Sequence, residues 1–232
     1  MASLILLTGW LASRLVLLFY DVRLPVTQLA GLGAVQALWS FLVLGFSWAA
    51  LVVAAGLVVL LVIQEKAGPD GWLNAMRLVV LLMVLSVLTI ARHRLGAHPV
   101  QVELWILATI GKTALWFLFG LLLVANEANF AIRSLFHVSG VEPRSPSAPD
   151  GGIDQREYNA GRIIGILERW LMYIVLVISH NYTIIAIVIA AKGFARFKAL
   201  DDREFAEYVL IGTLASTLIT VVIAEAVVVL MG

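Results

Sequence analysis

Side chains that could carry chemistry are concentrated in the last third of the chain, from Gly161 to Glu225. At about 100° per residue, a helix through this segment places several of them on one stripe at i+3 and i+4 steps. Polar groups at membrane depth need partners or water, so this polar stripe is expected to face other helices or an aqueous path. Its members are Arg162, Arg169, Tyr173 and His180, with Thr183 at its border.

His180 is the most distinctive member, because it is expected near the middle of a long apolar run. An imidazole changes charge near neutral pH, so one interpretation is a proton-responsive group. The alternative is a neutral histidine that hydrogen-bonds across a helix interface. The following helix carries a hydroxyl face, which either bonds across helices or lines a wet pathway. That face consists of Thr213, Ser216, Thr217 and Thr220.

One cation, Lys112, lies well inside the apolar run from Glu103 to Ala125. A charge at that depth costs a few kcal/mol unless it faces a partner or water. We therefore interpret Lys112 as an intramembrane charge. It either lines a path or pairs with a carboxylate such as Glu103 or Glu127.

A short charged connector, Lys192–Glu207, joins the last two apolar runs. If the helix continues through it, Lys192, Arg196 and Arg203 share a face, and Arg203 and Glu207 form an i,i+4 pair. One interpretation is a helical hairpin held at the membrane surface by its own ion pairs. The other is a gate that responds to an effector, or a site for anionic headgroups.

Composition assigns the chain to a membrane and excludes several functions. Of its 232 residues 62% are hydrophobic and 13% are charged, against roughly 45–50% and about 25% in soluble domains. A net charge of +1 provides no basic excess for nucleic acid. There are no cysteines for thiolate chemistry. No nucleophile motif, carboxylate–histidine cluster or metal-ligand spacing indicates an enzyme, a cofactor or a bound metal.

The apolar runs predict an all-α, polytopic membrane protein with about five to six transmembrane helices of roughly 20 residues and an interfacial helix. Residues 2–20 are either a short first span or an interfacial helix with Arg14 snorkelling. Ala34–Ile63 is expected to be one long span that bends at Gly45 or Gly56. Further spans are expected at 73–91, 103–125, 159–191 and 205–231, with an amphipathic interfacial stretch at 126–138.

The polar stretch 139–158, rich in proline and glycine, is the one internal boundary and is expected to be a flexible loop. It separates an N-terminal membrane region, 1–138, from a C-terminal two-helix hairpin, 159–232. In the hairpin, Gly161 and Gly165 are four residues apart, a spacing that permits close contact between helices. Glu225 is expected at a membrane surface.

From Asn129 to Ser216 the chain resembles the C-terminal membrane region of a bacterial family known as domain of unknown function thirty-three-oh-seven. Two features depart from that family: Ser179-His180-Asn181 stands where a Gly-Gln-type sequence is expected, and the N-terminal part differs. The resemblance implies a multi-pass protein of the bacterial inner membrane and brings no known activity. The matching residues are Gly161, Arg162, Glu168, Arg169, Lys192, Arg196, Phe197, Arg203, Glu207, Tyr208, Gly212 and Thr213.

Three functions are compatible with these features, and no motif favours an enzyme. The leading hypothesis is a self-associating channel or pore for ions or small solutes, a homo-oligomer lined by the polar stripe and the hydroxyl face. A cytosolic regulator or partner could gate it through the connector. The second is a non-conducting scaffold or assembly subunit whose charges join helices to each other. The third is a membrane enzyme or a lipid-handling membrane protein.

Overall fold

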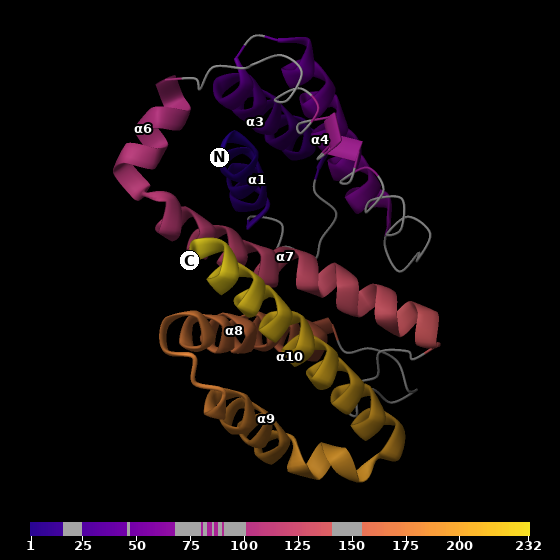
Figure 1. Ribbon diagram of the computed structural model, residues 1–232. Helices are drawn as coiled ribbons and strands as arrows, with labels where there is room; N and C mark the ends of the chain where they lie inside the picture. Colours follow the sequence, from indigo (N-terminus) through magenta and orange to yellow (C-terminus); the bar gives the residue numbers. More distant parts are fainter. Residues whose placement is uncertain are drawn as a thin grey trace. The chain divides into compact units, whose positions relative to one another are not determined.

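The structure is a computed structural model that describes residues 1–15, 25–45, 47–67, 101–140 and 155–232, with isolated positions between 80 and 90 (Figure 1). Every regular element in these residues is a helix, which confirms the all-α prediction for this part of the chain. The predicted span at 73–91 and most of the predicted loop at 139–158 lie outside it. Two compact units, Met1–Leu122 and Leu123–Gly232, divide within one helix, whereas the sequence-based boundary lies at 139–158.

The first unit begins with a short helix packed on a longer one. Trp39 donates a hydrogen bond from Nε1 to the carbonyl of Leu6 at 3.2 Å. A Cβ at Gly9 would lie 2.2 Å from the ring of Trp39, so only glycine fits there. Arg14 is buried, with its guanidinium 4.6 Å from the ring centre of Trp10, and does not extend to the surface. The helices of this unit are α1 (Ala2–Ser13), α3 (Val26–Leu44), α4 (Trp48–Ala67), α6 (Gln101–Ile110) and the start of α7 (Lys112–Ser139).

The single long span predicted for 34–63 is wrong, because α3 and α4 form an antiparallel hairpin. α3 ends at Gly45, whose φ of +70° is a conformation that glycine adopts without strain. The hydroxyl of Ser47 then accepts the N–H of Ala50 at 3.3 Å and begins α4. A Cβ at Gly33 would lie 3.7 Å from Val58, which shows that the two helices lie side by side.

The predicted span 103–125 is also divided, at Gly111, where φ is +81°. Lys112 is therefore the first residue of α7, and its side chain is exposed. The expected position of this cation inside a continuous helix is wrong for this reason. The stretch 126–138 is the C-terminal half of α7 rather than a separate interfacial helix.

The second unit holds the end of α7 and a chain that reverses twice (Figure 1). Because α9 returns the chain, α8 and α10 run in the same direction. Their contacts follow this order: Arg169 meets Ser216, and further along Tyr182 meets Glu225. The elements are α8 (Gln155–Ser179), α9 (Thr183–Ala195), the 3₁₀ helix η1 (Phe197–Asp201) and α10 (Arg203–Met231).

The single span predicted for 159–191 is wrong, because α8 and α9 reverse at His180–Tyr182. His180 has a φ of +50° at the end of α8, and the side-chain oxygen of Asn181 accepts the N–H of Thr183 at 3.0 Å. Lys192 then lies 2.7 Å from Glu168. In one straight helix these two residues would be about 36 Å apart at 1.5 Å per residue.

Helix α10 carries its polar side chains inward and its apolar side chains outward. The buried face contains Thr213, Ser216, Thr217 and Thr220, at 0 to 9% exposure. The opposite face exposes Leu210, Leu214, Leu218 and Val222, at 53 to 65%. A protein in water buries its large aliphatic side chains in preference to its hydroxyls. This reversed arrangement is the one that a lipid environment stabilises.

Three helices in the described residues are long and apolar enough to cross a membrane: α3, α7 and α10. Their lengths of 19, 28 and 29 residues match or exceed a hydrocarbon core of about 30 Å. This supports a membrane protein. It does not fix the number of spans.

Candidate functional site

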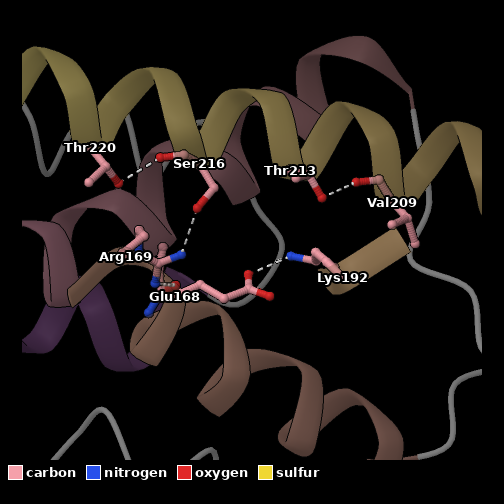
Figure 2. Close-up of polar contacts among 8 residues, drawn as sticks. Glu168, Arg169, Lys192, Val209, Thr213, Ser216 and Thr220 are labelled. Atoms are coloured by element: carbon pink, nitrogen blue, oxygen red, sulfur yellow. Dashed lines mark hydrogen bonds and ion pairs between the residues drawn. The ribbon is translucent and has the colours of Figure 1, made fainter. Parts of the chain in front are cut away.

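Arg169 of α8 is the centre of a polar cluster that joins three helices among the described residues of the second unit. Its side chain is 3% exposed and touches both α7 and α10. Nε donates to the carbonyl of Val124 at 2.8 Å, Nη2 to the Oδ1 of Asn129 at 2.6 Å, and Nη1 to the hydroxyl of Ser216 at 3.3 Å. Figure 2 shows Ser216 pointing from α10 toward this guanidinium.

The geometry suits a guanidinium because it is planar and presents several N–H groups in a fixed fork. A buried charge costs much free energy unless hydrogen bonds compensate for the lost water. Here three acceptors from two neighbouring helices provide that compensation. Arg169, Asn129, Ser216 and the Val124 carbonyl are called the arginine clamp below.

Glu168, the neighbour of Arg169, points toward α9 instead of α10 (Figure 2). Consecutive residues of a helix differ by about 100° in direction, so the pair of charges serves two different helices. Oε2 of Glu168 accepts a hydrogen bond from Nζ of Lys192 at 2.7 Å, and both side chains are largely buried. This ion pair holds the end of α9 against α8.

Gly161 and Gly165 provide space for arginines and not for the backbone of another helix. A Cβ at Gly161 would lie 3.2 Å from Nη2 of Arg196, and one at Gly165 would lie 3.5 Å from Nη1 of Arg169. The spacing that indicates close helix contact therefore accommodates guanidinium groups on the surface of α8.

The hydroxyl face of α10 is satisfied largely within its own helix. Thr213 donates to the carbonyl of Val209 at 2.6 Å, and Thr220 to that of Ser216 at 2.8 Å (Figure 2). Threonine commonly bonds one turn back in this way. Thr217 is buried on the same face at 9% exposure. These residues form a packed interface between helices.

The other members of the polar stripe have different surroundings. Tyr173 is fully buried, one turn after Arg169. Arg162 is partly exposed, whereas His180 and Thr183 are exposed at the reversal between α8 and α9. There the hydroxyl of Tyr182 donates to Glu225 near the end of α10. The structure thus brings Arg169 to the hydroxyl face and separates His180 from both.

The connector is not one continuous helix, because α9 ends at Ala195 and η1 follows. Lys192, Arg196 and Arg203 therefore do not share a helical face. The predicted pair between Arg203 and Glu207 is present, at 3.0 Å and with both side chains well exposed. Asp202 caps α10 by accepting the N–H groups of Glu204 and Phe205, at 2.9 and 3.1 Å.

Sequence reasoning missed three partners in this unit. Asn129 belongs to the stretch 126–138, which was predicted to be interfacial. Tyr182 had no feature in the sequence that distinguished it from its neighbours. Glu168 had one signal, since it adjoins an arginine inside an apolar run. In the described residues, no group of three or more His, Cys, Asp or Glu side chains could hold a metal ion.

Lys112 belongs to the first unit, where it is exposed and contacts neither Glu103 nor Glu127 among the described residues. Glu103 instead lies 3.8 Å from the amine of Met1. No family model, curated protein or solved structure matches the chain. The resemblance over residues 129–216 therefore stays a prediction.

Proposed function

We propose that this chain is a multi-pass membrane protein whose second unit is a rigid, non-conducting scaffold, an assembly subunit in a larger membrane complex. The arginine clamp carries this proposal. A polar stripe needs a water-filled path or a second protomer only if its polar groups lack partners. Arg169 finds its partners within one chain.

The outward faces support the location in a bilayer. On α8 the exposed residues Ile164, Leu167, Leu171 and Ile178 lie opposite the buried Ile166, Arg169 and Tyr173. Helices α4 and α8 have 20 and 25 residues, or about 30 and 37 Å. Together with α3, α7 and α10, and with α9 and η1 returning the chain across the bilayer between the parallel helices α8 and α10, they would give six spans, the upper predicted number. A bacterial inner membrane follows from the resemblance alone.

Reconstitution in liposomes tests the absence of conduction. We expect the release of trapped ions and of a small dye to equal that of empty liposomes. The channel hypothesis would instead give release that His180→Ala and Lys112→Ala alter. Such release, from a protein that elutes as a homo-oligomer, would overturn the scaffold proposal.

Cross-linking in native membranes tests the assembly role, and the chain offers a clean background because it has no cysteines. Leu218→Cys places a thiol on the outward face of α10, and Thr220→Cys places one on the buried face. We expect a discrete cross-linked product with a second polypeptide from Leu218→Cys only. A product of twice the chain's mass would indicate self-association, and no product from any outward position would contradict the assembly role.

A further inference from the structure

The segment Phe194–Lys198, with the sequence FARFK, joins the end of α9 to the start of η1. Phe194 and Phe197 are among the most exposed large apolar side chains in the described residues, at 88% and 72%. Lys198 is exposed and Arg196 is partly exposed. This aromatic–basic segment presents two rings and two cations together at one end of the second unit.

The two cations of this segment differ from the other two in the connector. Lys192 is paired with Glu168, and Arg203 is paired with Glu207. Among the described residues, no carboxylate lies within ion-pair distance of Arg196 or Lys198. The nearby carboxylate of Asp202 is occupied as the cap of α10, and Asp201 is exposed beside it.

Arg196 is held in place without being neutralised. Its guanidinium lies 5.8 Å from the ring centre of Phe205, and Nη2 lies against Gly161, where a Cβ would be only 3.2 Å away. An aromatic face attracts a cation but leaves its net charge intact. The side chain is therefore held in place two residues before Lys198, with its charge available to an anion.

We propose that the aromatic–basic segment binds the headgroup of an anionic phospholipid. Arg196 and Lys198 would contact the phosphodiester, and Phe194 and Phe197 would lie among the first acyl carbons. Guanidinium and ammonium groups are the usual protein partners of phosphate oxygens. Basic residues beside a bilayer are attracted to its anionic lipids. The proposal rests on the membrane location proposed above but not on the scaffold role.

Native mass spectrometry of the full-length protein, released from micelles with mixed lipids, tests this site. Wild-type protein should retain phosphatidylglycerol in preference to phosphatidylcholine. Arg196→Gln and Lys198→Gln should each reduce that preference about fivefold, the factor expected for one cation at an anionic surface. Arg203→Gln removes the same charge from an exposed residue that is already paired, so it should change the preference less than twofold.

Two further measurements ask whether Arg196 acts through its charge or through its packing, and whether the bound anion is a lipid headgroup or free phosphate. Arg196→Lys keeps the charge and should retain the preference within about twofold, whereas a purely structural role of Arg196 would make it resemble Arg196→Gln. Inorganic phosphate should not displace the lipid, because it cannot use the aromatic side chains. An equal fall in all three glutamine variants, or no preference in wild type, would overturn the proposal. Extraction by detergent but not by alkaline carbonate reports membrane embedding separately.

Discussion

At the scale of single residues, the arginine clamp is the feature whose removal should cost most. Arg169→Met removes the donors and leaves the buried hydroxyl of Ser216 and the half-buried Oδ1 of Asn129 without this partner. We expect a loss of roughly 1–3 kcal/mol of unfolding free energy, because that is the usual cost of stranding buried polar groups. The measurement is unfolding by added sodium dodecyl sulfate in mixed micelles.

Arg203→Met is the matched control for this prediction. The side chain of Arg203 is 90% exposed, and its pair with Glu207 lies on the surface of α10. Exposed ion pairs contribute about 0–1 kcal/mol, so this change should be close to neutral. Equal effects of the two substitutions would show that Arg169 does not join the helices.

His180 was expected in the middle of a span, but it lies at the exposed turn that ends α8. Its φ of +50° is left-handed, and its side chain is exposed. Glycine adopts this conformation freely, whereas other residues lose roughly 1–2 kcal/mol there. His180→Gly should therefore raise the midpoint of detergent unfolding, and His180→Val should lower it. Destabilisation by glycine would show that the imidazole makes a needed contact.

At the scale of elements, the reversal between α8 and α9 decides the fold of the second unit. The pair between Glu168 and Lys192 closes this hairpin across 24 residues of sequence. A double-mutant cycle with Glu168→Gln and Lys192→Met should give a coupling above roughly 0.5 kcal/mol, because both groups are shielded from solvent. The exposed pair Arg203–Glu207, measured in the same way, should give less. A coupling near zero for Glu168–Lys192 would argue that the hairpin is open.

The positions at which one helix ends and the next begins were the hardest feature of the fold to predict from the sequence. The reversal at Gly45 and the break at Gly111 had glycines as signals, but each glycine lay in an apolar run long enough for one helix. The reversal at His180–Tyr182 had neither glycine nor proline. The apolar runs correctly predicted helices over most of the described residues, although the first turn of α8 at 155–158 was assigned to the loop. A run of apolar residues could not distinguish one long helix from two helices that fold back on each other.

The site prediction was correct where the helix is unbroken and wrong where an unpredicted helix break intervenes. Arg169 and Tyr173 were assigned to an inward face from their spacing, and both are buried. The assignment holds because the two residues lie one turn apart on an unbroken part of α8. His180 was placed at mid-membrane only by counting through a break. Its actual position depends on Glu168 and Glu225, which contact α9 and the turn across a long sequence separation.

At the scale of the whole molecule, the hairpin predicts a two-sided labelling pattern for the second unit. Ser179 ends α8 beside the turn, and Lys198 follows α9 at the other end of the hairpin. Residues Arg203 and Glu225 of α10 are about 33 Å apart along the helix, close to the thickness of the hydrocarbon core of a bilayer. Ser179→Cys and Lys198→Cys should therefore react with a membrane-impermeant maleimide from opposite sides.

The single-span alternative gives a different labelling result. One helix over 159–191 would place Ser179 inside the hydrocarbon core, where the maleimide could not reach it. Protection of Ser179→Cys from both sides, with Lys198→Cys labelled, would thus support a continuous span and contradict the hairpin. Val188→Cys, buried in α9, serves as the negative control for both arrangements.

The arginine clamp also constrains how the protein can be made. Its partner Asn129 precedes Arg169 by 40 residues, and Ser216 follows it by 47. At about 5–20 residues per second, a ribosome needs roughly 2–9 seconds to reach Ser216 after Arg169. During that interval the guanidinium has acceptors on α7 alone. The nascent α8 must therefore be sheltered beside α7 until translation delivers the last helix.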